Sequence, residues 1–321
     1  MKVKSLWNSF WFAPASYLDL AVLRIIAVGT QLFYMVNEQF SDLVYVYGLP
    51  HNVYKPLPLL RVFVWPLGFA DPPHSSVIFG IYGLCLVCGL AGLLGLLTNV
   101  SLLLFALGCL FLQTFVFSFQ QYHHPEALLL LALLAVALGP SGRVVSLDSL
   151  WRNRSREPVK WVPVLSYSGD YAGWPVRFVQ CLFPLIYLSA AVAKLAYNHY
   201  SLDWANGFTL QYYLIQDHIR KDVPLAWWAS QFHVLILLAQ YLVLVYQCTY
   251  WAVVPWPRLR WIYLPLGLAF HLGNYLVLDA PFPQWIVLLC VYIPWTTALL
   301  RLADTRIAVP APPTQPVTRS E

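Results

Sequence analysis

The chain has 321 residues, of which 60% are hydrophobic and only 10% are charged, and its formal net charge is +5. A soluble domain carries about 25% charged residues, so this composition excludes an ordinary soluble fold. The polar connections between the apolar stretches are too short to form a second domain. We therefore expect one integral membrane domain.

Windows of about 20 apolar residues predict about eight membrane spans. In chain order they are residues 18–36, 76–97, 99–119, 125–139, 175–197, 226–254, 261–278 and 282–300. The fourth is short for a full span, and the sixth is long enough to tilt or overhang. The expected fold is all-α, a polytopic transmembrane helix bundle within residues 1–303. Residues 304–321 are Pro-rich, and we expect a disordered cytoplasmic tail there.

Lysine and arginine residues are distributed unequally between the two sides of this predicted bundle. With a cytoplasmic N-terminus, the cytoplasmic segments hold Lys2, Lys4, Arg143, Arg152, Arg154, Arg156, Lys160, Arg258, Arg260, Arg301, Arg306 and Arg319. The opposite side holds only Lys55, Arg61, Arg220 and Lys221. This positive-inside bias predicts that both termini are cytoplasmic. The net charge then reflects membrane topology, and no nucleic-acid partner is expected.

Two features of the first two spans have structural interpretations. Arg24 lies one to two turns from the inner surface, where it can snorkel toward water or meet Asp19, and we favour this over a ligand role. Cys85 and Cys88 lie on one helical face in the middle of the second span. A thiol pair beside a quinone can exchange electrons, but these two lie away from the outer rim. We therefore interpret them as packing residues, because free cysteines are common in cores.

The fifth span contains a lysine, Lys194, within an otherwise apolar run. A lysine at the centre of a membrane span costs roughly 2.5–3.5 kcal/mol on insertion scales, and less near an end. Such residues face a bundle interior or a wet cavity, because exposure to lipid is unfavourable. An amine held away from water can also serve as a base near neutral pH. Lys194 is therefore a candidate for chemistry.

All eight histidines fall in the non-cytoplasmic half of the predicted bundle. His124 caps the outer end of the fourth span with Glu126 beside it, Lys194 lies one turn from the outer end of the fifth, and His271 lies about halfway along the seventh. For any single histidine, a locally hydrogen-bonded packing role is the favoured interpretation. For Lys194 and His271 together, the functional interpretation is favoured, with both lining one outward-facing cavity. No metal site is predicted.

Several motifs occur in the order typical of a known family. The stretch Tyr122-His-His-Pro-Glu126 and its apolar helix, followed by Ser146-Leu-Asp148, resembles the His-helix-Ser-Leu-Asp pattern of the HTTM superfamily. This is the membrane domain shared with vitamin K-dependent γ-glutamyl carboxylase. The segments 187–195, 203–207 and 270–275 resemble that family's lysine helix, its Asp-Trp-x-x-Gly sequel and its second histidine helix. Residues 12–14 and 23–25 are similar to its opening.

The resemblance implies roles for individual residues. In the carboxylase, the lysine matching Lys194 deprotonates vitamin K hydroquinone, and the histidine matching His124 positions or polarises the quinone. His271 occupies the other histidine position. The resemblance thus implies Lys194, His124 and His271 as catalytic residues and a reduced, vitamin K-like quinone as cofactor. The candidate substrate-binding residues are Asp203, Trp204, His123 and Glu126.

The sequence departs from the carboxylase pattern in two places. The carboxylase has a large lumenal region after the bundle, whereas this sequence ends soon after its last predicted span. It also has Ala193 where the carboxylase has a second lysine. These departures leave protein carboxylation without support, because a shared scaffold does not carry a shared function.

Two functional classes therefore stay open. The first is a carboxylase- or epoxidase-like membrane enzyme that uses a hydroquinone, or a related lipid, with Lys194 as base. The second is a non-catalytic membrane partner that binds a lipid, a secreted peptide or another membrane protein during export or maturation. In either case we expect a multi-pass protein of the cell membrane or, in a eukaryote, of the endoplasmic reticulum.

Overall fold

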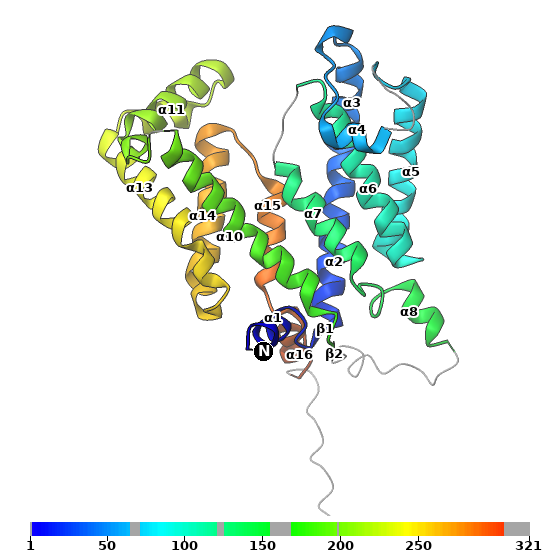
Figure 1. The fold of residues 1–321 in the computed structure, drawn as a ribbon. Helices are drawn as coiled ribbons and strands as arrows, with labels where there is room; N and C mark the ends of the chain where they lie inside the picture. The colour runs from blue at the N-terminus through cyan, green and yellow to red at the C-terminus, as the bar shows by residue number, and fades with distance from the viewer. Residues whose placement is uncertain (1, 65–70, 121–124, 155–167, 198, 305–321) are drawn as a thin grey trace, which may run out of the picture.

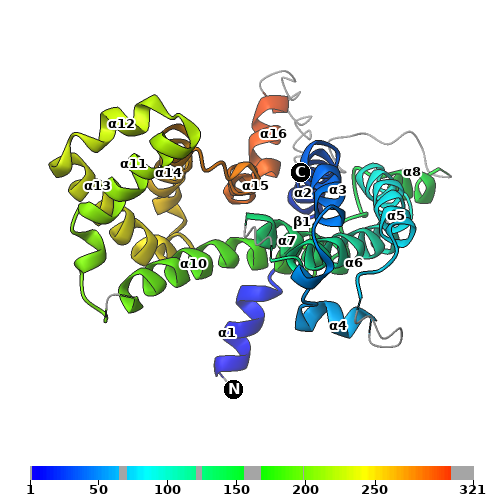
Figure 2. The same ribbon diagram turned by 90° about the horizontal axis from the view of Figure 1, so that it is seen from above.

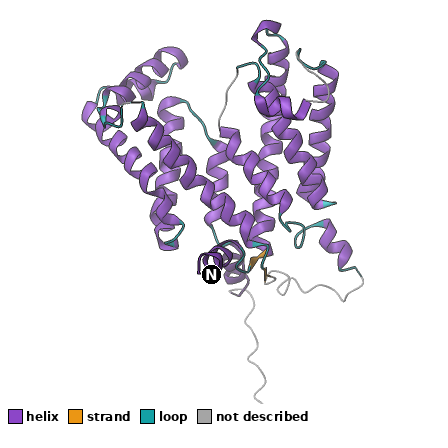
Figure 3. Cartoon of the chain, viewed as in Figure 1, coloured by secondary structure: helices purple, strands orange, loops and turns teal. Residues whose placement is uncertain are grey.

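The computed structural model describes residues 2–64, 71–120, 125–154, 168–197 and 199–304 (Figure 1). The described residues are almost entirely helical, which confirms the predicted all-α class (Figure 3). Two short strands, β1 (Ala15–Ser16) and β2 (Ser168–Gly169), pair antiparallel, with Ala15 opposite Gly169. The predicted tail, apart from its first residue, lies outside the described residues.

The helices in the first half of the chain are α1 (Lys2–Trp11), α2 (Tyr17–Tyr34), α3 (Phe40–Tyr47), α4 (Pro58–Val64), α5 (Ser75–Leu94), α6 (Thr98–Phe117), α7 (Pro125–Leu138) and α8 (Leu147–Arg152). A π-helical segment, Met35–Gln39, joins α2 to α3 without a break. In the second half they are α10 (Gly173–Ala196), α11 (Phe208–Lys221), α12 (Pro224–Ser230), α13 (His233–Thr249), α14 (Arg260–Leu278), α15 (Pro283–Leu288) and α16 (Trp295–Asp304). The 3₁₀ helices are His51–Val53, Asp203–Ala205, Tyr250–Val253, Pro257–Leu259 and Leu289–Tyr292.

These helices form two groups that both views separate (Figures 1 and 2). We call residues 17–138, which hold α2 to α7, the α2–α7 lobe, and residues 173–278, which hold α10 to α14, the α10–α14 lobe. Helix α10 packs on α7 of the first lobe and on α13 of the second, and α15 lies between the lobes against α7 and α2. Helix α10 and α15 therefore connect two otherwise separate helix groups.

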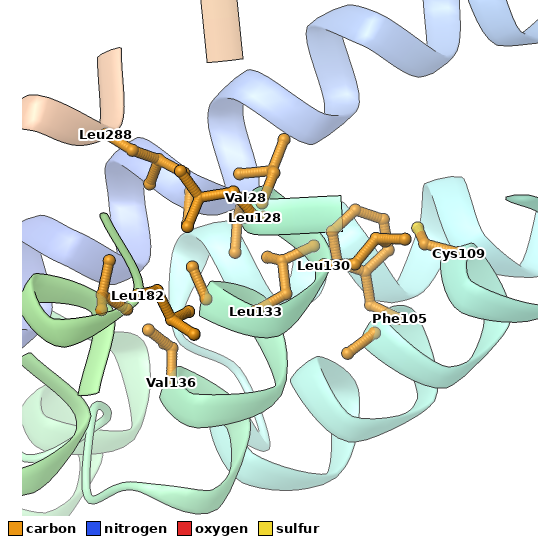
Figure 4. Packing of buried hydrophobic residues seen from close by; sticks show 14 of the residues in the cluster. Val28, Phe105, Cys109, Leu128, Leu130, Leu133, Val136, Leu182 and Leu288 are labelled. Carbon is orange, nitrogen blue, oxygen red and sulfur yellow. The ribbon is translucent and has the colours of Figure 1, made fainter. Parts of the chain in front are cut away.

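The main hydrophobic core lies where α2, α6, α7, α10 and α15 meet (Figure 4). Val28, Leu128, Leu133, Phe183 and Leu288 are all fully or almost fully buried there. Cys85, Cys88 and Cys109 belong to the same core, and all six cysteines are free. These positions agree with the packing interpretation of Cys85 and Cys88.

Six helical segments are long and apolar enough to cross a membrane. They are Tyr17–Tyr47, Ser75–Leu94, Thr98–Phe117, Gly173–Ala196, His233–Val253 and Pro257–Leu278. Their outward faces carry large exposed apolar side chains such as Phe33, Leu84 and Leu242, as expected for helices surrounded by lipid. The protein is therefore a multi-pass membrane protein. The total of eight spans and the cytoplasmic termini stay predictions.

The eighth and the sixth predicted spans differ from the structure. The eighth, residues 282–300, is broken into Pro283–Tyr292 and Trp295–Leu302, which are bent by 71°. Ile293 is extended because the ring of Pro294 disfavours helical backbone at the preceding residue. The sixth, residues 226–254, is divided between α12 and α13, because the helix is interrupted at Gln231 and Phe232. The fourth, residues 125–139, agrees with α7, a short apolar helix of 14 residues.

Arg24 is fully buried and holds the connection after α7 in place. Its Nη1 donates a hydrogen bond to the carbonyl oxygen of Ser141 at 2.9 Å, and its Nη2 donates to that of Val145. The predicted partner Asp19 instead accepts from the backbone N–H of Thr296 at 2.8 Å. The structural interpretation of Arg24 is therefore confirmed, but Asp19 as its partner is wrong.

The Ser146-Leu-Asp148 motif belongs to the same connection. Asp148 Oδ1 accepts from the N–H of Leu97 at 2.9 Å, and Oδ2 accepts from the N–H and the hydroxyl of Thr98 at 2.8 and 2.7 Å. These bonds cap the first turn of α6. Ser146 forms a capping box with Ser149 at the start of α8. We call Arg24, Ser146 and Asp148, with the carbonyls that they contact, the polar junction.

Candidate functional site

A mostly apolar cavity of about 560 Å³ lies on the side of the α10–α14 lobe that faces α7 and α15. Its walls come mainly from α10, α11, α13 and α14, with Phe282 and Trp285 at α15, and Ala127 of α7 lies on the side nearest the other lobe. The polar or charged residues that line it include Lys194, Trp204, Gln247, Tyr187, His271 and Asn274. Ligand pockets occupy about 300–1,000 Å³ and combine apolar walls with a few placed polar groups. This space, which we call the central cavity, has both properties.

Lys194 lies in the last turn of α10 and is only partly exposed. Its Nζ donates to the side-chain oxygen Oε1 of Gln247 at 3.1 Å and to the carbonyl oxygen of Ala190 at 3.3 Å. The indole ring of Trp204 lies 5.3 Å from Nζ, within cation–π range. These contacts hold the amine at the cavity wall.

His271 is almost completely buried in the middle of α14. Its Nε2 lies 2.9 Å from the hydroxyl of Tyr187, and the rings of Phe270, Phe282 and Trp285 surround it. Among the described residues, the other ring nitrogen, Nδ1, has no hydrogen-bond partner. A buried polar atom without a partner is unusual in a folded protein, so Nδ1 stands out among the polar atoms near the cavity.

The cavity also contains polar residues that sequence analysis missed. Tyr187 contacts His271, and Gln247 contacts Lys194. Gln240 donates to the carbonyl of Trp204 and accepts from the N–H of Gly207, both at 2.7 Å, and so fixes the loop that carries Trp204. Gln240 and Gln247 lie seven residues apart, on one face of α13. Two glutamines at that spacing in an apolar span are the sequence signal that could have identified this face of α13 as part of a polar site.

The structure brings together only some of the predicted site residues. Lys194, His271 and Trp204 all line the central cavity. Asp203 is exposed and accepts a hydrogen bond from the hydroxyl of Ser201 at 2.6 Å, away from the cavity. Glu126 is buried and does not line the cavity, although its neighbour Ala127 does. The predicted positions of His123 and His124 lie outside the described residues.

The lining of the central cavity contains few charged groups. Among its lining residues Lys194 is the one cation, and no carboxylate contributes to the wall. In the described part of the chain, no three His, Cys, Asp or Glu side chains gather in an arrangement that holds a metal ion. The described wall therefore offers one amine, one imidazole and several neutral polar groups.

A second groove of about 280 Å³ continues from the cavity between α13 and α14. The two spaces share Leu210, Val243, Phe270, Asn274 and Leu278. The groove is otherwise lined almost entirely by apolar side chains, and Gly273 beside it faces open space. We call it the α13–α14 groove.

Fold and site together define a class: an all-α, multi-pass membrane protein with an internal cavity that carries a buried histidine and a lysine. The sequence pattern of the HTTM domain matches residues 14–297, which is most of the chain. The chain therefore belongs to the HTTM family, as its ordered motifs predicted. No curated protein and no solved structure matches the chain.

Proposed function

We propose that this protein is a membrane enzyme that uses a reduced lipid quinone, with Lys194 as its base and His271 as a positioning group. The observation that carries the proposal is that Lys194 and His271, on different helices, line one apolar cavity. The HTTM assignment and the implied roles of both residues agree with this arrangement.

The residues of the central cavity fit a quinone ring. Phe270, Phe282 and Trp285 offer flat apolar surfaces, and His271 Nδ1 offers a buried polar atom with no partner among the described residues. A bound hydroquinone would supply ring hydroxyls of tunable acidity and electrons for chemistry with oxygen. The apolar walls exclude water, which protects reactive groups from side reactions.

The contacts of Lys194 suit proton transfer. As a base, Lys194 takes a proton at Nζ, and Gln247 and Ala190 accept its N–H bonds in both the charged and the neutral state. The amine therefore exchanges a proton without leaving the cavity wall. The hydroxyl of Tyr187 is hydrogen-bonded to Nε2 of His271, so Nδ1 is the ring nitrogen that is left to bond a ligand oxygen. His124 keeps its predicted role of positioning the quinone.

The α13–α14 groove supports a ligand with an apolar tail. It is continuous with the central cavity and almost entirely apolar, so a chain attached to a ring in the cavity gains free energy by entering it, about 0.8 kcal/mol per buried CH₂. A lipid quinone combines a ring and a tail of this kind.

The test compares Lys194→Arg and Lys194→Ala with the wild type in detergent. Arginine keeps the charge but does not titrate in the physiological range. With menadiol as the probe, we expect Lys194→Arg to fold and bind but to lose oxygen-dependent turnover by about 10²- to 10⁴-fold. Lys221→Arg is the matched control, because Lys221 does not line the central cavity and its Nζ donates to main-chain carbonyls, those of Leu278 and Asp279.

If both Lys194 variants turn over menadiol as fast as the wild type, Lys194 is not the base. If the wild type binds the probe without consuming it, the non-catalytic alternative is favoured, in which the cavity holds a lipid or peptide during export or maturation.

A further inference from the structure

A second cavity, of about 470 Å³, lies at the other end of α10 from Lys194. Its lining includes Asn99, Leu138, Arg143, Arg152 and Trp174. Trp174 and Lys194 are twenty residues apart on one helix, which is about 30 Å along its axis. This space is therefore separate from the proposed quinone site, and we call it the basal cavity.

The lining of the basal cavity holds two arginines, Arg143 and Arg152, and one carboxylate, Asp148, so its net charge is positive. Arg143 is exposed; its backbone N–H donates to the carbonyl of Pro140, but its guanidinium makes no hydrogen bond or ion pair with a described residue. Arg152, which also lines the cavity, donates from Nη2 to the carbonyl of Gly142 at 2.5 Å. The one carboxylate in the lining, Asp148, already accepts three hydrogen bonds from Leu97 and Thr98.

The basal cavity lies at the level where apolar helices end. Helix α6 begins at Thr98, α7 ends at Leu138 and α10 begins at Gly173, and residues next to these ends line the cavity. Aromatic residues favour the boundary between lipid and water, and Tyr171 and Trp174 lie in the lining. The mouth of the cavity therefore lies at the depth of lipid headgroups.

The short helix α8 places apolar side chains beside this charge. Leu147, Leu150 and Trp151 are 42%, 55% and 70% exposed, while Arg152 of the same helix lines the cavity. In water such exposure is unfavourable, but at a membrane surface these side chains enter the acyl region while the arginine stays with the headgroups. A ligand here has a negative headgroup and apolar chains.

We propose that the basal cavity binds an anionic phospholipid, with Arg143 and Arg152 contacting its phosphate and α8 and Leu138 contacting its acyl chains. The predicted topology places this end of the bundle on the cytoplasmic side, and in many membranes that leaflet is rich in anionic lipid. The charge selects an anionic over a zwitterionic headgroup, and the exposed apolar residues select a lipid over free phosphate.

The experiment titrates the detergent-purified full chain with dioctanoyl phosphatidylglycerol, with dioctanoyl phosphatidylcholine and with inorganic phosphate. Binding is measured by native mass spectrometry and by the melting temperature. We expect phosphatidylglycerol to bind and to stabilise more than the other two. Arg143→Gln should weaken its binding by about fivefold, since one basic residue near a membrane surface contributes about 1 kcal/mol.

Arg143→Gln removes no hydrogen bond or ion pair to a described residue, so its folding is expected to be normal. The matched control is Arg258→Gln, an exposed arginine of the segment before α14 that does not line the basal cavity. Equal stabilisation by phosphatidylcholine or by inorganic phosphate overturns the proposal. An equal loss of affinity in Arg258→Gln also overturns it, because general surface charge then explains the binding.

Discussion

The two lobes both bury charged or polar side chains, but they use them differently. In the α2–α7 lobe, Arg24 donates to main-chain carbonyls, and Asp148, in the connection that follows the lobe, accepts from the start of α6. In the α10–α14 lobe, Lys194 and His271 border a cavity. Packing differs in the same direction at the extremes: 56% of an 18-residue apolar stretch in Thr98–Phe117 is buried within the protein, against 11% in Pro257–Leu278. The corresponding share is 33% in Ser75–Leu94, Gly173–Ala196 and His233–Val253. A buried polar group that bonds main chain holds the fold, whereas one that borders a cavity is accessible to a ligand.

The largest expected effect is on the polar junction. Arg24→Ala removes two charge-assisted hydrogen bonds and leaves the carbonyls of Ser141 and Val145 without their donor. We expect it to lower the free energy of unfolding by about 3 kcal/mol. The measurement is the melting temperature in detergent, with Arg258→Ala as an exposed control. An unchanged melting temperature in Arg24→Ala would contradict the structural role.

The next effect tests the groove of the other lobe. Gly273→Leu places a side chain in the open space of the α13–α14 groove and so displaces about two CH₂ groups of a bound tail. We expect about tenfold weaker binding of a long-tailed quinone and unchanged binding of tail-less menadione. Gly80→Leu is the matched control, because Gly80 of α5 also faces open space. Equal losses for the two quinones would show that the groove does not hold the tail.

A smaller effect, on how stability depends on pH, again concerns the polar junction. Burial raises the pKa of Asp148, but the hydrogen bonds from Thr98 and Leu97 and the charge of Arg152 outweigh it, so that the pKa lies below its usual value. The stability from this carboxylate is therefore present above the unfolded pKa of about 3.9 and is lost as the pH falls through the lower folded pKa. Asp148→Asn should cost about 1 kcal/mol near neutral pH.

The melting temperature of wild type and Asp148→Asn, measured between neutral pH and pH 3, tests this account. The difference between the two proteins should shrink as the pH falls below the unfolded pKa of about 3.9, because the carboxylate then binds a proton more readily in the unfolded state than in the folded state. A constant difference over the whole range would mean that the carboxylate charge does not contribute.

The smallest effect concerns the orientation of His271. Tyr187→Phe keeps the ring but removes the hydroxyl that bonds Nε2. We expect a loss of about 1 kcal/mol or less in stability and a severalfold loss of menadione affinity, because the imidazole is no longer fixed. Tyr263→Phe is the control, since its hydroxyl bonds Thr249 outside the cavity. If both variants bind alike, Tyr187 does not position His271.

The sequence predicted the fold class from the length of its apolar stretches and the family from the order of its motifs. It predicted the shared cavity of Lys194 and His271 because both residues fall in the same half of the predicted bundle. It did not predict the acceptors of Arg24, which are carbonyls 117 and 121 residues away and leave no trace in side-chain patterns. Tyr187 was missed because a tyrosine in an apolar span resembles a packing residue. Its role depends on how α10 meets α14, which the sequence does not specify.

The central claim is that the cavity of the α10–α14 lobe holds a lipid quinone. Its most direct test is to purify the protein in native lipid and to identify co-purifying quinone by mass spectrometry, in the wild type, in Ala190→Trp and in Ala193→Trp. Ala190 lines the cavity, whereas Ala193 of the same helix is exposed elsewhere. We predict quinone in the wild type and in Ala193→Trp and its loss from Ala190→Trp. Its absence from the wild type, or equal amounts in all three proteins, would contradict the claim.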